Sequence, residues 1–355
     1  MVRSIEWVDD PRPMVRLIDQ TLLPGTEQYI DVLTVDVLVK SIQDLVIRGA
    51  PALGAAGALG VALAMVQAGE DNWDAARLES EINRIRDARP TAVNLAWGVN
   101  QVRGSVPSGT AKVLGLARKV VADDEAANRQ LSKHGADWIL AHVAKEEVRV
   151  VTHCNTGALA TSAWGTAYGI IHELHQRGRL GLVYADETRP LLQGARLTSW
   201  ELLHDGIEHV VQADSAAAST ILRGLADVAI IGADRIAANG DTANKVGSVG
   251  LALACQRAGI PFVVAAPSST VDLTIARGED IIIEERHQDE VLCWAGVRTT
   301  PTGVRGFNPA FDVTPHDLIS IVVTERGVAE MATSDELPAI VGLLVDDPLG
   351  KKDRA

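Results

Sequence analysis

The feature that most constrains the fold is an alternation in the second part of the chain, where short apolar runs are separated by segments of helix length. Strands that alternate with helices form βαβ units, and their strands lie parallel in a doubly wound sheet. The composition agrees, because 47% of the residues are hydrophobic and few are aromatic, as in strands covered on both faces. The predicted strands are Val148–Thr152, Leu180–Ala185, His209–Ala213, Val228–Gly232, Pro261–Ala266 and Ile281–Ile283.

Polar side chains collect where these predicted strands end. In open α/β sheets, ligands bind in the crevice beyond the carboxyl ends of the strands. The sequence therefore predicts a functional site at this edge. The polar segments are His153–Asn155, Asp186–Arg189, Asp214–Ser215, Ala233–Arg235 and Pro267–Ser269.

The first third of the chain has helical periodicity after a short extended start. Its predicted helices are Asn72–Arg86, Ala92–Val102 and a long helix over Lys112–His142 with a break near Asp123. A chain of 355 residues suggests two domains. We expect a smaller, mainly helical N-terminal domain over residues 1–122 and a C-terminal α/β domain with a parallel sheet over residues 123–355.

One stretch, Ala50–Ala68, is nearly uncharged and about as long as a membrane span. It consists mainly of alanine and glycine and is only modestly hydrophobic. Gly54, Gly57 and Gly60 recur every three residues, so one face of the helix lacks side chains and another backbone can approach it. The stretch therefore predicts a tightly packed helix of a soluble protein.

The charge and the cysteines limit the partners and the compartment. A formal net charge of −13 disfavours nucleic acid and anionic membranes. The three cysteines are odd in number and no two have CxxC spacing, which favours a reducing cytoplasm and predicts no metal site. The N-terminal residues lack the apolar core of a signal peptide. We expect a cytoplasmic protein that acts on a small anion in a local cationic pocket.

Cys154 is a candidate catalytic residue because it follows a predicted strand, and Thr156 and Gly157 predict the start of the next helix. A thiolate near a helix N-terminus is stabilised by the helix dipole. The alternative is a buried, inert thiol. Cys255 and Cys293 fall in a helical and a mixed segment and are expected to be structural.

Asp234 is a candidate general acid because it follows the apolar run at Val228–Gly232. Partial burial would raise the pKa of its carboxyl and keep it protonated. The alternative is that Asp234 caps a turn or pairs with Arg235.

Several further segments can bind an anion or a hydroxyl. Residues 237–248 read as a turn-rich loop that leads into a helix, and Lys245 beside such a helix start is suited to phosphate. The spacing is not that of a Walker A motif, and a solvated loop is the alternative. Arg48 and Arg89 each precede another helix start, and the Gln193 amide can bond a sugar hydroxyl. No GxGxxG sequence follows a strand, so no dinucleotide cofactor is expected.

The ordered set of these motifs resembles one family. The matching segments are Arg48–Pro51, Arg89–Leu95, Thr152–Gly157, Glu187–Pro190, Gln193–Thr198, Gly232–Ile236, Asn239–Lys245 and Asn308–Pro315. Together they resemble the methylthioribose-1-phosphate isomerases, in the superfamily that includes the regulatory subunits of translation initiation factor 2B.

The resemblance implies a helical N-terminal domain, a Rossmann-like catalytic domain, a homodimer, no metal and no organic cofactor. It implies that Asp234 donates a proton and that Cys154 is the second catalytic group. It assigns the phosphorylated sugar to a further set of residues, Arg48, Gly49, Ala50, Arg89, Gln193, Asn244 and Lys245. The implied reaction is the conversion of 5-methylthioribose 1-phosphate to 5-methylthioribulose 1-phosphate in methionine salvage.

The chemistry explains the need for an acid. The phosphate on the anomeric oxygen prevents ring opening to a free aldehyde, so an acid, Asp234 in this scheme, must protonate the ring oxygen. Hydrogen then moves from C2 to C1, either as a proton through a phosphoenolate or as a hydride. Cys154 can be the base or can stabilise the charged intermediate, and the sequence leaves both routes open.

Two rival functions follow from the same motifs. A sister isomerase would act on 5-deoxyribose 1-phosphate or ribose 1,5-bisphosphate, with the same ring chemistry. A non-catalytic regulatory subunit of a translation-factor assembly would share the fold without needing Cys154 and Asp234 together.

Overall fold

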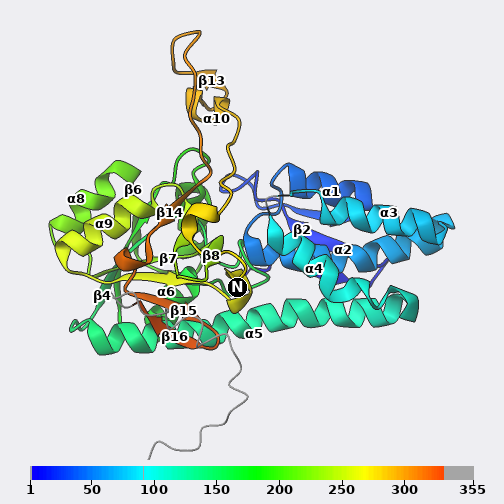
Figure 1. Cartoon of the computed structure of the whole chain (residues 1–355), viewed down its shortest axis with the longest axis horizontal. Coiled ribbons are helices and arrows are strands. Elements are labelled where there is room, and N and C mark those ends of the chain that lie inside the picture. The colour runs from blue at the N-terminus through cyan, green and yellow to red at the C-terminus, as the bar shows by residue number, and fades with distance from the viewer. Residues whose placement is uncertain (1, 91, 332–355) are drawn as a thin grey trace, which may run out of the picture.

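The computed structural model describes residues 2–90 and 92–331 as a mixed α/β protein, so Thr91 of the quoted motifs and the C-terminal residues of the second predicted domain lie outside the described residues (Figure 1). Its largest sheet has seven strands in the order β16-β15-β10-β7-β4-β5-β6. All neighbours in it are parallel except β15 and β16. The strands are β4 Val148–Thr152, β5 Leu180–Asp186, β6 His209–Gln212, β7 Val228–Ile231, β10 Phe262–Ala265, β15 Ile321–Thr324 and β16 Gly327–Glu330.

Five of the six predicted strands are confirmed, as β4, β5, β6, β7 and β10. The strand predicted over Ile281–Ile283 is wrong. Ile282 is 89% exposed, and the place beside β10 is taken by β15, in the register Val263 to Ile321. Three apolar residues between acidic neighbours offer too little surface to compete for that place.

Helices cover the sheet and connect its strands. They are α6 Ala167–Gln176, α7 Ser199–His204, which continues a π-helical turn over Gly194–Thr198, α8 Ala217–Leu222 and α9 Ser248–Ala258. A second sheet has the order β11-β8-β9-β14, with β11 Val271–Asp272, β8 Arg235–Ala237, β9 Thr242–Lys245 and β14 Phe311–Thr314. The turn-rich loop predicted over residues 237–248 is wrong in part, because Thr242–Lys245 is the strand β9 of a β8–β9 hairpin, whereas residues 238–241 form a turn and a helix begins at Ser248 as predicted.

A short arm projects from the body of the molecule in Figure 1. It contains α10 Asp289–Leu292, β12 Cys293–Trp294 and β13 Val297–Arg298. The segment before this arm, which includes the mispredicted run, leads from the sheet region out to it.

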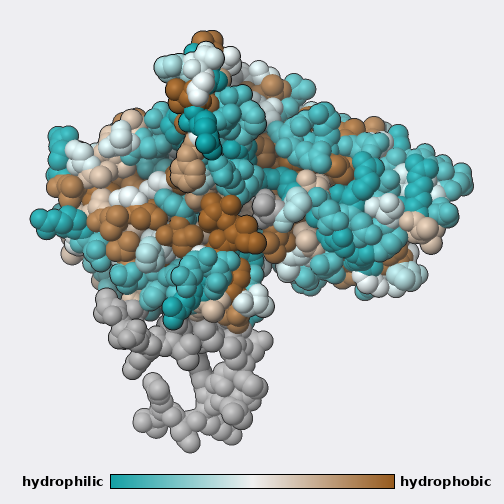
Figure 2. Space-filling model, turned by 45° about the horizontal axis from the view of Figure 1, so that its top comes forward, coloured by the Kyte–Doolittle hydropathy of each residue, from teal (hydrophilic) through white to brown (hydrophobic). Residues whose placement is uncertain are grey.

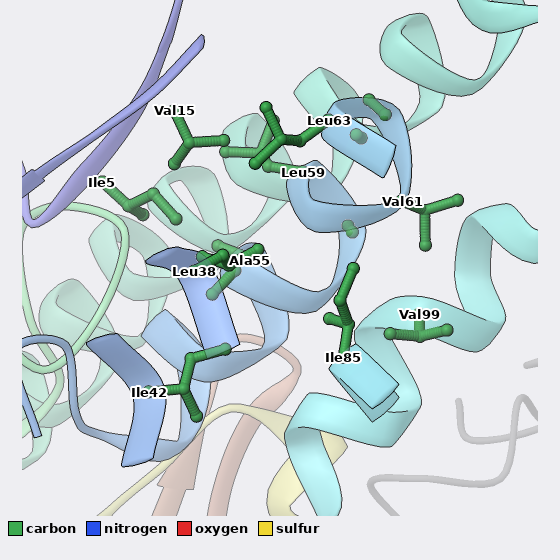
Figure 3. Packing of buried hydrophobic residues seen from close by; sticks show 14 of the residues in the cluster. Ile5, Val15, Leu38, Ile42, Ala55, Leu59, Val61, Leu63, Ile85 and Val99 are labelled. Atoms are coloured by element: carbon green, nitrogen blue, oxygen red, sulfur yellow. The ribbon is translucent and has the colours of Figure 1, made fainter. Parts of the chain in front are cut away.

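The first part of the chain packs around one central helix. Its elements are the antiparallel strands β1 Ile5–Val8, β2 Met14–Ile18 and β3 Tyr29–Val32, and the helices α1 Val35–Gln43, α2 Ala50–Asp71, α3 Ala75–Arg86, α4 Val93–Arg103 and α5 Thr110–His142. Leu38, Leu59 and Ile85 meet around α2 in Figure 3. The predicted helices are confirmed, with Asn72–Arg86 beginning only at Ala75.

The glycines of α2 permit the close helix contact that the sequence predicts. A Cβ at Gly57 would lie 2.4 Å from the carbonyl oxygen of Leu95 on α4, and one at Gly98 would lie 1.9 Å from the carbonyl oxygen of Gly54. By length and composition α2 is apolar enough to cross a membrane, yet 78% of its most apolar window is buried inside the protein. It is the core helix of this region.

Helix α5 runs along both parts of the molecule (Figure 1). Ala117 lies in the core around α2, whereas Leu131 and Ala136 lie in the core on one face of the seven-stranded sheet. The predicted break near Asp123 is wrong, because the helix is continuous through its 33 residues. The division between residues 122 and 123 falls within this helix and stays a prediction.

Candidate active site

Cys154 lies beyond the carboxyl end of β4 with its backbone in the left-handed region, at φ 64°. Two threonine hydroxyls hold this conformation. The Cys154 N–H donates to Thr188 Oγ1 at 2.9 Å, and Thr198 Oγ1 donates to the Cys154 carbonyl at 2.6 Å. A residue with a Cβ adopts this region only when its surroundings enforce it, and such residues concentrate at functional sites.

The helix predicted to begin at Thr156 is wrong. Residues 155–166 form an irregular loop, and α6 begins at Ala167, so the helix that follows Cys154 in the chain does not begin beside the thiol. Burial raises the pKa of Cys154, and the positive charges of Arg48 and Lys245 offset this only in part. The resting group is therefore a neutral thiol with two cations beside it.

Asp234 follows β7, and its N–H donates to the Ala243 carbonyl at 2.9 Å. Its side chain is partly exposed, but enough protein surrounds the carboxyl that burial raises its pKa. The charges of Lys245, Arg48 and then Arg89 offset this rise in part. The elevated pKa suits a proton donor.

Arg48 reaches the loop after Cys154. Its Nη2 donates to the carbonyl oxygen of Asn155 at 2.8 Å and to Asn155 Oδ1 at 3.0 Å. Its Nε is buried and has no partner among the described residues. A buried donor without a partner is costly, so this N–H is available to a ligand.

Gly49 allows Arg48 to come so close. Its φ is +95°, and a Cβ would lie 2.2 Å from the carbonyl oxygen of Ala160 in the same loop. Ala50 opens α2, and the Ala52 N–H donates to that carbonyl at 3.2 Å. The start of α2 is therefore joined to the loop that follows Cys154.

Asn244 and Lys245 lie on β9 and are buried. The Lys245 Nζ donates to the Ala310 carbonyl at 2.7 Å and lies 4.3 Å from the centre of the Phe311 ring. Burial lowers the pKa of Lys245, and Cys154 and Asp234 act against that change. Asn244 Nδ2 donates to Ser248 Oγ at 2.8 Å.

The N-terminus of α9 is not the free anion site that the sequence predicts. Asp312 Oδ2 on β14 accepts from the N–H groups of Gly247 at 2.8 Å and Val249 at 3.3 Å. A carboxylate from a strand distant in sequence thus caps the helix, and a phosphate there would meet this negative charge.

Arg89 and Gln193 come from two other segments, and of the two only Arg89 acts on the Asp234 carboxyl. Arg89 lies 3.6 Å from Glu284, and burial lowers its pKa while Glu284 acts in the opposite direction. Gln193 is buried, and its Oε1 has no partner among the described residues. A free acceptor of this kind can bind a hydroxyl group.

The structure brings most of the predicted cations together and directs two others elsewhere. Arg48, Arg89 and Lys245 all act on the Asp234 carboxyl. Arg235 instead pairs with Asp272 at 3.3 Å. Arg189 donates to the Glu290 carbonyl and stacks on Trp294 at the base of the arm.

His153, Asp186 and Asp214 lie close enough together to suggest a metal site. However, the atoms that would bind a metal ion already form hydrogen bonds within the protein. The His153 ring bonds Asp186 Oδ2 through Nδ1 and the Val246 carbonyl through Nε2, both at 2.9 Å. Asp214 accepts from the backbone N–H groups of residues 188 and 189, both at 2.7 Å. Because a carbonyl only accepts, Nε2 carries a proton and offers no lone pair to a metal. The cluster is a hydrogen-bonded support for the end of β4.

The sequence did not single out several residues that shape the site. They are Asn155, Thr188, Thr198, Glu201 and Glu284. Asn155 and Thr188 belong to the polar strand ends, so a signal for them existed. Glu201 and Glu284 act through distant partners and give no local signal.

The chain matches the family model described as the initiation factor 2 subunit family over residues 46–331. A methylthioribose-1-phosphate isomerase of Gloeobacter violaceus is 46% identical, over 92% of this chain and 93% of the relative. A probable bifunctional methylthioribose-1-phosphate isomerase/methylthioribulose-1-phosphate dehydratase of Nocardia farcinica is 48% identical over 94% of this chain. The chain spans only 60% of the length of that relative.

Two solved structures also resemble this chain. The 5-methylthioribose 1-phosphate isomerase from Pyrococcus horikoshii OT3 has a TM-score of 0.86 and 36% identity, covering 97% of this chain and 96% of that chain. A protein described as translation initiation factor eIF-2B, subunit delta, from A. fulgidus has a TM-score of 0.81 and also 36% identity, covering 93% and 96%. The two solved proteins are named for different functions, so the fold alone does not distinguish an isomerase from a translation-factor subunit.

Proposed function

This chain belongs to the initiation factor 2 subunit family, and we propose that it is an enzyme, an aldose–ketose isomerase that converts 5-methylthioribose 1-phosphate to 5-methylthioribulose 1-phosphate in methionine salvage. The observation that carries the proposal is the placement of Cys154 and Asp234 beyond the carboxyl ends of the neighbouring strands β4 and β7, where Arg48 and Lys245 act on both groups. Relatives that cover more than nine tenths of the chain carry the name of this activity.

Asp234 is the proton donor. Protonation of the ring oxygen breaks the bond between that oxygen and C1 without releasing the phosphate. Burial raises the pKa of Asp234, so the carboxyl holds its proton until the ring oxygen takes it. The cations beside it then stabilise the carboxylate that remains.

Hydrogen transfer from C2 to C1 takes place beside Cys154. As a base, Cys154 would remove the C2 proton as a thiolate, and Arg48 and Lys245 are the charges that favour this form. In the hydride route the thiol stays neutral and lines a site with little water. Hydrogen then moves with its electron pair from C2 to C1, and the C2 hydroxyl becomes the carbonyl by returning its proton to the Asp234 carboxylate. The raised pKa of Cys154 favours direct transfer.

Substrate deuterated at C2 separates these routes. Direct transfer carries the label to C1 of the product in full, as measured by NMR. A proton route through Cys154 exchanges part of the label with solvent, and substantial exchange within one turnover would exclude direct transfer.

The substrate is bound by Arg48, Gly49, Ala50, Arg89, Gln193, Asn244 and Lys245. The three cations balance the phosphate dianion, since an unpaired dianion is costly to desolvate. The Arg48 Nε and the Gln193 Oε1, which have no partner in the part of the chain that the structure describes, are suited to a phosphate oxygen and a sugar hydroxyl. No step of this scheme needs a metal or an organic cofactor.

The group at C5 is methylthio rather than phosphate. A second phosphate would need its own cations, and the two further candidates, Arg189 and Arg235, are engaged elsewhere. The apolar residues of the first part of the chain can receive a methylthio group. Its loss would cost about 1–3 kcal/mol, so 5-deoxyribose 1-phosphate is a weaker substrate.

We also propose that the protein is a cytoplasmic homodimer. Figure 2 shows hydrophobic side chains gathered in a band across one face of the sheet region. Leu222 on α8 and Leu253 on α9 are 57% and 51% exposed, and a second copy can cover such residues. Light scattering during size-exclusion chromatography gives the molar mass of the protein in solution. The mass of a monomer at micromolar concentration would contradict the proposal.

Side-by-side kinetics with 5-methylthioribose 1-phosphate, 5-deoxyribose 1-phosphate and ribose 1,5-bisphosphate test the function. The expected order of kcat/KM is the order in which these substrates are named. A preference for the bisphosphate would assign the sister activity, whereas no turnover of any of them would favour a regulatory role like that of the eIF-2B subunits.

A further inference from the structure

Asn155 links a buried acid to a cation of the site. Its Oδ1 accepts from Arg48 Nη2 at 3.0 Å, and its Nδ2 donates to Glu201 Oε2 at 2.5 Å. A guanidinium only donates and a carboxylate only accepts, so these two partners fix the orientation of the Asn155 amide, whose Nδ2 also donates to Thr198 Oγ1 at 3.3 Å. Turning the amide over would place donors against Arg48.

Glu201 is buried, and both of its carboxylate oxygens have hydrogen-bond donors. It lies on α7 and is 4% exposed. Its second oxygen, Oε1, accepts from the Leu159 N–H at 3.2 Å. A Cβ at Gly157 would lie 2.3 Å from the carboxylate, so that position leaves no room for a side chain. Both oxygens of Glu201 therefore face donors.

We propose that Glu201 is a positioning residue for Arg48. The ionised carboxylate of Glu201 holds Asn155 in the orientation that keeps the Arg48 guanidinium beside Cys154. The inference rests on the proposed function, because Arg48 matters there as a ligand of the sugar phosphate. Glu201 itself touches neither the substrate nor the reacting atoms.

Protonation of Glu201 would undo this arrangement. A proton on either oxygen would face the N–H of Asn155 or of Leu159, and one of these bonds must break. If Asn155 turns to present its oxygen to the acid, its NH₂ group faces Arg48 and repels it. Burial raises the pKa of Glu201 to about 7, so this exchange falls near neutral pH.

Other titratable groups also surround this acid. Asp205 on the same helix raises the pKa of Glu201, and Arg48 lowers it. Tyr168 on α6 donates to Asp205 at 2.8 Å, and His172 lies 3.7 Å from that carboxylate. Burial lowers the pKa of His172. His204 lines the small cavity beside Glu201. Tyr168 and His172 therefore lie against Asp205, whereas Arg48 is the charged group that bonds Asn155.

The test is the ratio of wild-type to Glu201→Gln kcat/KM across pH. Glutamine has one donor group on its amide, so it must break one of the two bonds as the protonated acid does. The ratio should be roughly ten at about pH 8, as expected for a lost hydrogen bond to a charged group. It should approach one near about pH 6, where only about a tenth of Glu201 is ionised. The loss should appear chiefly in KM.

Two matched variants sharpen the test. Asp205→Asn removes a neighbouring acid that does not bond Asn155. Its kcat/KM should still fall at low pH, as that of the wild type does when Glu201 takes up a proton. That fall should shift to lower pH, because the charge of Asp205 raises the pKa of Glu201. Asn155→Ala should lose the pH dependence as Glu201→Gln does. A wild-type to Glu201→Gln ratio that is independent of pH would reduce Glu201 to a structural role and overturn the inference.

A readout without turnover keeps this inference separate from the proposed function. The ¹⁵N-labelled side-chain amide of Asn155, identified by its loss in Asn155→Ala, should titrate near pH 7 in the wild type. An amide signal that does not titrate would overturn the inference even if the isomerase is active. A titrating amide in a protein that turns over no sugar phosphate would support the inference and contradict the proposed function.

Discussion

The two parts of the molecule contribute to the site in different ways. The sheet region supplies Cys154 and Asp234 from the ends of β4 and β7, held by backbone hydrogen bonds of the sheet. The helical region supplies Arg48 from the start of α2, held by the contact between Gly49 and Ala160. Figure 2 shows the contrast at the surface, where the helical region is mostly hydrophilic and the sheet region carries the hydrophobic band. The difference indicates that chemistry resides on the sheet and that the helices add charge by docking.

Substitutions in the sheet region should therefore reduce kcat, whereas substitutions at the docking contact should reduce binding and stability together. The predictions below test this division.

Asp234→Asn should have the largest effect. An amide cannot donate the proton, so kcat should fall by about 10²–10⁴-fold with little change in KM. Asp227→Asn is the matched control at the opposite end of β7, where the carboxylate pairs with Arg149. It should lower stability and leave kcat unchanged. A variant at 234 that keeps half its activity would remove Asp234 from the chemistry.

Alkylation of Cys154 should abolish activity, and saturating substrate should protect the enzyme. Burial raises the pKa of Cys154, so the thiolate is scarcer at pH 7 than in a free cysteine. The rate should keep rising with pH beyond the usual thiol range near about 8.5. Cys154→Ser should be severely impaired, and Cys255→Ser and Cys293→Ser should remain active. Fast inactivation of the Cys154→Ser protein would identify another thiol as responsible.

Gly49→Ala should damage the docking contact without touching the catalytic pair. The new methyl group would meet the Ala160 carbonyl in a backbone conformation that alanine disfavours. We expect roughly 1–3 kcal/mol lost from the free energy of unfolding, and a rise in KM because Arg48 is displaced. Gly69→Ala is the control, since nothing lies within 4 Å of a Cβ there. Equal urea midpoints for these two variants would contradict the role given to Gly49.

Thr198→Val should have the smallest of these effects. It removes the hydroxyl that donates to the Cys154 carbonyl, so the thiol is held less firmly, and kcat should fall a few-fold, by an amount on the order of one neutral hydrogen bond. Ser320→Ala is the control, because it removes a hydroxyl that accepts from the Phe262 N–H at the start of β10. If both variants change kcat equally, Thr198 has no specific role at Cys154.

The sequence predicted those parts of the fold whose signal is local. The strands β4, β7 and β10 were found because they are short apolar runs bounded by polar residues. The β8–β9 hairpin was missed because its strands pair with β11 and β14, which lie far along the chain and give no local signal. The same limit explains the cap that Asp312 provides for α9.

For the site, the sequence predicted the candidate residues, but it did not predict the neighbouring groups that shift their pKa values. Thr156 and Gly157 look like a helix start, yet the loop that follows is held by distant bonds, from Ser162 N–H to Asp124 at 2.7 Å and from Leu159 N–H to Glu201. Partners so far apart in the chain leave no periodic signal. The thiol of Cys154 therefore lies near cations from other segments rather than at the start of the helix that follows it in the chain.

The isomerase activity is tested most directly by ¹H NMR of 5-methylthioribose 1-phosphate incubated with the purified protein in buffer containing EDTA. We expect 5-methylthioribulose 1-phosphate to accumulate to equilibrium with the wild-type protein, and at least about 10²-fold more slowly with Asp234→Asn. No ketose product from the wild type, or equal rates for the two proteins, would contradict it.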